Sequence, residues 1–217
     1  IVIAYVDGQD PVWQKDYETY MKTPVLAKRF RDWGTLPYLF RGIQYQMPFI
    51  ENVFLVVSHD SQVPSWVDRD NVKVVLHRDY IPEEYLPTFN STTIGLFLHR
   101  IPGLGEQYLY FNDDIFPVGE CHPEDYFRNG KVSIGISTHL FVTGMYKHHV
   151  KRSNQIARKA LGKCGTPFFI RPQHSCIPML KSECEKVFQE QKATILNSIS
   201  RVRTNDNLNM SLYMSYM

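Results

Sequence analysis

Short apolar runs alternate with amphipathic stretches along the chain. Runs with the length and the valine, isoleucine and aromatic content of buried strands occupy residues 1–6, 51–58, 71–77 and 108–111. Between these runs, apolar residues recur at helical spacing over residues 37–47 and again over residues 91–100. The repeated order of strand, helix and strand predicts an α/β fold with a mostly parallel sheet flanked by helices.

The second half of the chain is predicted to add one strand and three helices. Residues 131–137 have the composition of a strand, and residues 146–161 form a basic amphipathic helix. A further helix is predicted over residues 177–190, and a last one after Arg203. In the first half, residues 17–32 are polar, aromatic and basic, and we expect helix and loop there.

The apolar run over residues 108–111 stops abruptly at Asn112, Asp113 and Asp114. Adjacent carboxylates at a strand end repel each other and lose solvation, so a cation usually faces them. A hard divalent ion would accept these oxygen ligands, and a phosphate substrate would complete its coordination. Because open α/β sheets bind ligands at the carboxyl ends of their strands, this stretch is the first candidate site. The alternative is a solvated Asn-Asp-Asp turn.

The loop after the first strand contains Asp7, Gly8 and Asp10. Gly8 can adopt backbone angles that other residues avoid, and the flanking acids could hold the base or ribose of a nucleotide. An ordinary Asp-Gly turn is the simpler interpretation of the same residues. The chain has neither a G-x-x-x-x-G-K-[ST] phosphate loop nor a G-x-G-x-x-G dinucleotide fingerprint.

Two later residues suit work at a phosphate. His174 precedes the helix predicted over residues 177–190, whose N-terminus would attract an anion. Arg203 could bind phosphate through its planar fork of donors, or it could pair with a neighbouring acid. The cations of the helix over residues 146–161 are expected to form a solvated face or to meet a polyanionic acceptor.

Composition excludes several classes of protein. The 217 residues are 43% hydrophobic and 21% charged with a net charge of +2, which lacks the dense basic content of a nucleic-acid binder. No apolar run approaches the roughly 18 residues of a membrane span, and no signal peptide is visible. The chain begins inside a predicted strand, as a fragment of a longer protein would.

The cysteines and histidines form no metal-binding motif. The four cysteines show no C-x-x-C spacing and are predicted to be free thiols in a reducing compartment. They are Cys121, Cys164, Cys176 and Cys184. Three histidines lack a further ligand at regular spacing and are predicted to be hydrogen-bonded structural groups, at His139, His148 and His149.

Four blocks of residues, in order along most of the chain, carry a family resemblance. The first covers residues 1–13 and matches at YVDGQDP, residues 5–11, without the tryptophan that usually precedes the valine. The longest covers residues 36–117 and includes NVFLVVS, LHRIPGL and YLYFNDD. The third surrounds His174, and the fourth spans residues 203–216. Together they resemble the Stealth family, which includes microbial capsular-polysaccharide phosphotransferases and the catalytic subunit of the lysosomal-enzyme GlcNAc-1-phosphotransferase.

This resemblance implies a GT-A-like, Rossmann-like fold and one catalytic domain over residues 1–217, either whole or as part of a longer chain. It implies transfer of a sugar-1-phosphate from a UDP-sugar to a glycan hydroxyl, with release of UMP. The product would be a phosphodiester-linked capsular polysaccharide. GlcNAc-1-phosphate is the expected group, with ManNAc, galactose and glycerol phosphate as alternatives.

The resemblance also implies a role for each site residue. Asp113 and Asp114 would hold Mg²⁺ or Mn²⁺ against the diphosphate, or one of them would orient the acceptor. His174 would be the general base on the acceptor hydroxyl or a phosphorylated nucleophile, and Arg203 would stabilise charge on the transferring phosphoryl oxygens. The expected substrate-binding residues are Asp7, Gly8, Asp10, Asn90, Ser91, Arg100, Asn112, Asp206 and Asn207.

Two other functions stay open. A metal-dependent glycosyltransferase of the same fold would release UDP, although its acidic motif is typically Asp-x-Asp. A non-catalytic glycan-binding module would explain the acids but not His174 and Arg203. The expected partners are a UDP-sugar donor and an oligosaccharide or polysaccharide acceptor, and no nucleic acid. The expected location is the cytoplasm, with docking to the inner face of a bacterial membrane or to a capsule-assembly complex.

Overall fold

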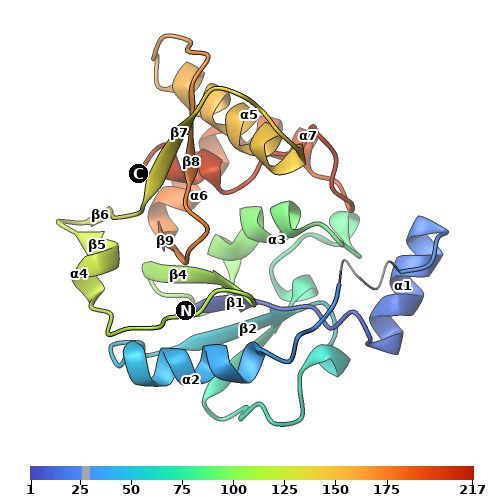
Figure 1. The fold of residues 1–217 in the computed structure, drawn as a ribbon. Coiled ribbons are helices and arrows are strands. Elements are labelled where there is room, and N and C mark those ends of the chain that lie inside the picture. The colour runs from blue at the N-terminus through green and yellow to red at the C-terminus, as the bar shows by residue number, and fades with distance from the viewer. Residues whose placement is uncertain (26–29) are drawn as a thin grey trace.

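A five-stranded sheet organises the protein, whose computed structural model describes residues 1–25 and 30–217 (Figure 1). The strand order is β3-β2-β1-β4-β9, and only the edge strand β9 runs antiparallel to its neighbour. The arrangement confirms the predicted α/β, Rossmann-like fold with a mostly parallel sheet. The strands are β1 (Val2–Ala4), β2 (Val53–Val57), β3 (Val72–Leu76), β4 (Gln107–Asn112) and β9 (Ile177–Leu180).

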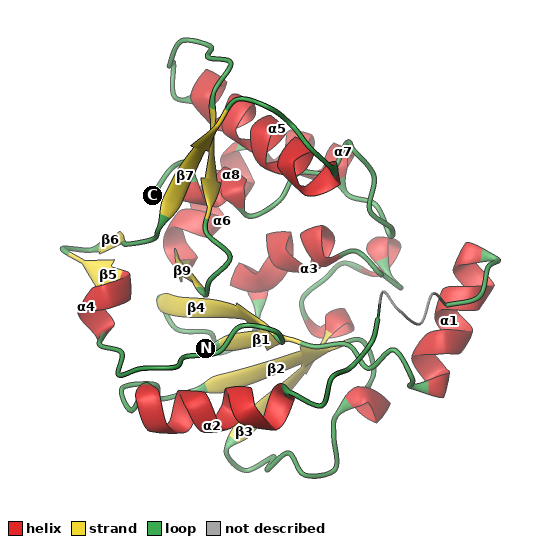
Figure 2. Ribbon diagram, in the orientation of Figure 1, coloured by secondary structure: helices red, strands yellow, loops and turns green. Residues whose placement is uncertain are grey.

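One face of the sheet packs against helix α2 (Leu36–Gln46), which lies below the strands in Figure 2. Successive side chains of a strand point to opposite faces, so Ile3, Leu55 and Phe111 share this side. All three are buried together with the apolar stripe of α2. The helix begins and ends within one residue of the predicted range, because its apolar spacing matched this face.

The other face packs against helices α3 (Ser91–Phe97), α6 (Lys181–Glu190) and α8 (Ser211–Met214). Val2 and Phe54 are register neighbours on this side and are buried under these helices. Figure 2 shows α3 and α6 above the strands, on the side opposite to α2. The sheet is therefore covered on both faces, which is why its strands are continuous apolar runs.

Helix α1 (Pro11–Met21) begins earlier than the segment of helix and loop expected over residues 17–32. The Asp10 side chain caps it by accepting a hydrogen bond from the Val12 N–H at 3.1 Å. Pro11 occupies the first turn, where its missing N–H costs nothing. The Asp-Gly-Gln-Asp-Pro stretch is therefore a helix start, and residues 26–29 of the predicted segment lie outside the described residues.

Two predictions for the second half are wrong. Residues 131–137 are not one strand but parts of two short ones, each paired antiparallel in its own two-stranded sheet. Residues 177–180 are strand β9 and not the start of a helix, because they pair antiparallel with β4. Pro178, which has no N–H to donate, is tolerated because β9 is an edge strand.

The remaining elements lie around the sheet, some above it and others beside it in Figure 1. Helix α5 is the predicted basic helix, shifted by one residue, and it packs along β8 and α8 in the upper part of Figure 1. Within residues 1–25 and 30–217, no helix has both the length and the apolar content that crossing a bilayer requires. The elements are α4 (Pro123–Tyr126), β5 (Phe127–Arg128), β6 (Lys131–Val132), β7 (Ile136–His139), α5 (Met145–Ala160), β8 (Phe169–Pro172) and α7 (Lys192–Ser198).

Candidate active site

Asp113 and Asp114 directly follow β4 at the carboxyl end of the sheet. Burial, followed by the negative charges of Asp114 and Asp32, raises the pKa of Asp113 to about 6. The Asp114 side chain is 65% exposed. A partly buried carboxyl beside two other acids is an unfavourable charge in the folded protein, and a cation at this position would relieve it.

His174 lies beside this carboxylate pair. Its Nε2 is 3.4 Å from Oδ2 of Asp114, although the two residues are 60 positions apart in the sequence. The reason is strand pairing: β9 runs back along β4 with Tyr110 opposite Ile177, so the connection before β9 returns to the carboxyl end of β4. The expected helix N-terminus at His174 is therefore absent, and its closeness to Asp114 is what links it to the site.

Arg203 approaches from a third segment. Its Nη2 donates a hydrogen bond to Oγ of Ser91, the first residue of α3. The pKa of the buried Tyr110 of β4 responds to the charge of Arg203 and to those of both acids. It is raised chiefly by burial, raised again by Asp113 and Asp114, and lowered by Arg203. The charges of the predicted catalytic acids and of the arginine thus all act on one tyrosine hydroxyl of β4.

Asn90 and Asn207 are buried and support the segment that carries Arg203. Asn90 caps α3 by accepting from the Thr92 N–H at 3.1 Å, and its Nδ2 donates to Oδ1 of Asn207 at 3.1 Å. Asn207 in turn donates to the carbonyl oxygen of Ser198 and accepts from the Thr204 N–H at 2.8 Å. Both asparagines, expected to bind substrate, are placed to hold residues 198–207 against the start of α3.

The loop after β1 is engaged in the fold. A Cβ on Gly8 would lie 2.3 Å from the carbonyl oxygen of Phe30, so close backbone approach requires glycine here. Besides capping α1, the buried Asp10 accepts a hydrogen bond from Oγ of Ser61 at 2.9 Å. Asp7 accepts from the Gln9 N–H, and its charge reaches Tyr5 together with those of Asp32 and Asp113. Of the three predicted loop residues, Asp7 is therefore the one whose charge, like that of Asp113, acts on the Tyr5 hydroxyl.

The structure separates Arg100 from the other candidates. It follows α3 at the start of β4, the opposite end from Asp113. Its neighbour His99 lies 3.2 Å from Glu185 of α6, a helix that begins beside the first residue of β4. Asn112, in contrast, is the last residue of β4 and accepts a hydrogen bond from the Tyr110 hydroxyl at 2.9 Å.

Sequence reasoning missed Asp32 and Tyr110 as parts of this site. Asp32 accepts a hydrogen bond from the Tyr5 hydroxyl at 3.1 Å and adds negative charge near Asp113. Nothing in the local pattern distinguishes Asp32 from an acid on a solvated loop, or Tyr110 from an ordinary core aromatic. By contrast, two expectations are confirmed: the four cysteines are free thiols, and His149 is a buried structural group that bonds the Thr204 carbonyl oxygen.

Asp113 and Asp114 could hold a divalent cation together with a substrate. Among the residues that the structure describes, no group of three or more His, Cys, Asp or Glu side chains is arranged to hold a metal ion. Mg²⁺ commonly binds one or two protein carboxylates and takes its remaining ligands from water and substrate phosphates. Two adjacent carboxylates, one of them with a raised pKa, fit that mode of binding.

Comparisons with known proteins point to one group. Residues 29–134 match a family model described as Stealth protein CR2, conserved region 2. A capsular polysaccharide phosphotransferase of Actinobacillus suis is 33% identical over 231 residues, which cover 99% of this chain and 62% of that protein. The receptor polysaccharide phosphotransferase WefC of Streptococcus gordonii is 30% identical over 257 residues, which cover 98% of this chain and 75% of that protein. The chain thus spans less than two thirds of the length of the Actinobacillus relative.

Proposed function

The chain belongs to the Stealth family, and from this membership we propose that it transfers a sugar-1-phosphate from a UDP-sugar to a hydroxyl of an acceptor glycan, with release of UMP. GlcNAc-1-phosphate is the proposed group, and a phosphodiester-linked capsular polysaccharide is the proposed product. The observation that carries the proposal is the closeness of His174 to Asp114 at the carboxyl end of β4, where the charges of Asp113, Asp114 and Arg203 all act on Tyr110. Phosphoryl transfer relies on such positioned acids, bases and cations and needs little covalent chemistry from the protein.

Asp113 and Asp114 are the proposed ligands of Mg²⁺ or Mn²⁺. When bound, the ion would supply positive charge that neutralises the diphosphate of the donor. The chain's own contribution is a pair of oxygen ligands held at the end of a buried strand, where β4 fixes their position. Burial has already removed part of the water around the Asp113 carboxylate. Binding a cation there therefore costs this carboxylate little further desolvation.

His174 is the proposed general base. If its Nε2 donates its proton to Asp114, Nδ1 is left with a lone pair that can accept the proton of the acceptor hydroxyl. The acceptor oxygen then forms a bond to the β-phosphorus, and the bond from that phosphorus to the bridging oxygen breaks. The electron pair leaves with UMP, the sugar C1–O bond stays intact, and Asp114 stabilises the imidazolium that forms.

Arg203 is the proposed electrophilic partner of the transferring group. A guanidinium presents planar donors that match two phosphoryl oxygens at once. Its hydrogen bond to Ser91 ties the side chain to the start of α3, and the buried Asn90 and Asn207 hold the segment that carries it. A donor positioned before the reaction stabilises developing charge without a reorganisation cost.

Nucleotide product analysis tests the proposal. The purified protein is incubated with UDP-GlcNAc, Mg²⁺ or Mn²⁺ and a capsule-type oligosaccharide, and the released nucleotide is separated by ion-exchange chromatography. We expect UMP, dependent on metal and lost in Asp114→Asn and His174→Ala. His122→Ala is the matched control, because His122 is also 61% exposed but lies in another segment. Release of UDP instead would assign the chain to glycosyl transfer and refute the proposed reaction.

A further inference from the structure

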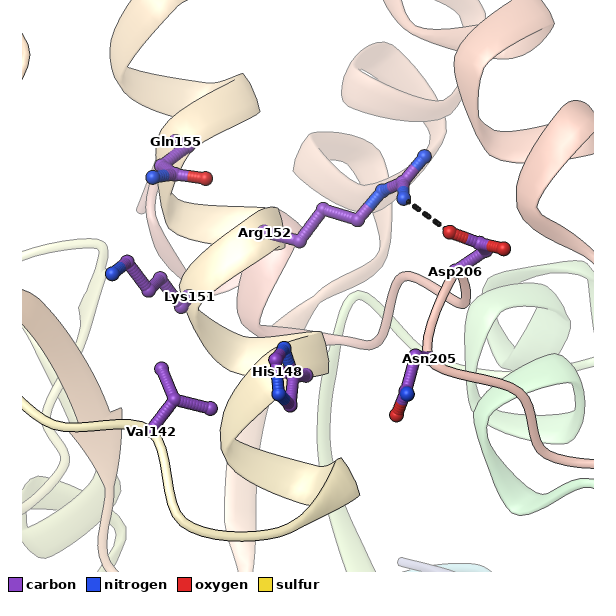
Figure 3. Close-up of a pocket in the computed structure, with 7 residues that line it drawn as sticks. All are labelled: Val142, His148, Lys151, Arg152, Gln155, Asn205 and Asp206. Carbon is purple, nitrogen blue, oxygen red and sulfur yellow. Dashed lines mark hydrogen bonds and ion pairs between the residues drawn. The ribbon is translucent and has the colours of Figure 1, made fainter.

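A cleft of about 520 Å³ separates α5 from the loop that follows Arg203 (Figure 3). Figure 3 shows side chains of α5 on one wall and those of Asn205 and Asp206 on the other. Most of the residues that line the cleft are polar or basic, unlike those of the apolar pockets that take most small ligands. Its lining residues are Val142, His148, Lys151, Arg152, Gln155, Asn205 and Asp206.

The helical wall of the cleft is one face of α5. His148, Lys151, Arg152 and Gln155 have the spacing that places side chains one above the other on a helix. The opposite face is buried, with Val150 fully covered. Since burial of that face fixes the rotation of the helix, the basic side chains are held toward the cleft by packing.

The charges of the cleft favour an anion. Arg152 donates from Nη1 to Oδ1 of Asp206 at 2.9 Å, and both side chains are exposed. Exposed ion pairs contribute little to stability, so a phosphate can compete with Asp206 for the guanidinium. Among the described residues Lys151 makes no ion pair, so its ammonium group is available to a ligand. The cleft thus offers one uncompensated lysine and one arginine that can exchange its partner.

The cleft adjoins the candidate active site through two contacts of α5. His149 donates from Nε2 to the carbonyl oxygen of Thr204 at 2.6 Å, and Thr204 directly follows Arg203. At the start of the same helix, the phenol of Tyr146 acts on the pKa of Tyr110, the tyrosine that also responds to Asp113. A glycan that leaves the active site along α5 would therefore enter the cleft.

We propose that this cleft binds a phosphodiester of the acceptor glycan, with Lys151 and Arg152 as its cationic ligands. The proposal rests on the proposed function, because each transfer would add one phosphodiester to the growing chain. The acceptor is then itself a polyanion after the first additions. A basic cleft beside the active site would hold a phosphodiester already made while the next hydroxyl reacts.

The test measures binding without turnover. One probe is a disaccharide whose two GlcNAc residues are joined through a phosphodiester, and its matched probe carries a glycosidic bond instead. Both are titrated into the protein by isothermal titration calorimetry. Charge-assisted hydrogen bonds of the kind lost in Lys151→Ala support about a tenfold change in affinity. We expect that loss for the phosphodiester probe alone, near-normal binding in Lys151→Arg, and no change in the exposed control Lys186→Ala.

Three results would overturn the proposal. The first is that the unaltered protein fails to bind the phosphodiester probe at millimolar concentration. The second is that Lys151→Ala loses the same affinity for both probes, and the third is that it loses affinity for neither. In the transfer assay, Lys151→Ala could instead raise the KM for UDP-GlcNAc and leave the KM for the phosphodiester acceptor unchanged. That result would assign the cleft to the donor and also overturn the proposal. Because calorimetry needs no reaction, an absence of UMP release would refute the proposed function and leave the binding result to decide this site.

Discussion

Replacing Asp113 with asparagine is expected to stabilise the fold and to abolish transfer. The pKa of Asp113 is raised from 3.8 to about 6, first by burial and then by the charge of Asp114. At about 1.4 kcal/mol for each unit, ionised Asp113 costs the folded state on the order of 3 kcal/mol. Asparagine keeps the size of the side chain and removes its charge, so we expect a gain of about 1–3 kcal/mol at pH 7. Each kcal/mol would raise the midpoint of thermal unfolding by about 2–4 °C in a chain of this length.

The pH dependence of this gain identifies its cause. Well below the ordinary pKa of 3.8 the carboxyl is protonated in both the folded and the unfolded chain, and the substitution should change little. Between about pH 4 and 6 the unfolded chain ionises first, which lowers the stability of the unaltered protein. Above the folded pKa of about 6 the difference between the two proteins should stay constant.

Urea unfolding followed by tryptophan fluorescence between pH 3.5 and 8 measures this difference directly. Asp70→Asn, at an exposed acid outside the site, is the matched control and should change stability by less than about 0.5 kcal/mol at any pH. Lower stability of Asp113→Asn at pH 7 would refute the reasoning. So would a gain in stability that is the same at pH 3.5 and pH 7.

Three further predictions test other parts of the site. Mg²⁺ added with UDP should raise the thermal unfolding midpoint of the unaltered protein but not that of Asp113→Asn, because ligands that bind only the folded state stabilise it. Equal shifts of the two midpoints would contradict a metal at Asp113. Gly8→Ala should cost about 1–3 kcal/mol in urea unfolding, because its Cβ would collide with the Phe30 carbonyl oxygen, and an unchanged midpoint would contradict that packing. Asn207→Ala should cost at least about 2 kcal/mol, since it removes the hydrogen bonds of the buried Asn207 side chain to Asn90, Ser198 and Thr204. It should also lower kcat by displacing Arg203; normal stability and kcat would contradict this role.

The central sheet and the acidic pair could be predicted because both depend on local pattern. A parallel strand covered on both faces must be a continuous apolar run, and β2 and β4 are such runs. Polar residues directly after the run then lie at the carboxyl end of the sheet, which is where Asp113 was expected and where it lies. The position of helix α2 followed in the same way from one apolar stripe.

What the sequence could not supply depends on long-range pairing. The residues of β9 are too few to show either a strand or a helix period, and their pairing with β4 makes them a strand. His174 was therefore expected beside a helix and lies instead beside Asp114. Asp10 was expected at substrate because no pattern showed that it caps α1. Arg100 belongs to the same sequence block as Asp113, residues 36–117, but it follows α3 at the opposite end of the sheet.

The segment between β4 and β9 leaves the sheet at Asp113 and returns to it just after His174. The register between the two strands therefore brings the segments that carry Asp114 and His174 to the same end of β4. Insertions or deletions within this excursion, which includes α5 and its basic face, would leave that strand pairing in place. Under the proposed function, the region proposed to face the acceptor can therefore differ from one relative to the next while the proposed phosphoryl-transfer residues keep their place at the end of β4.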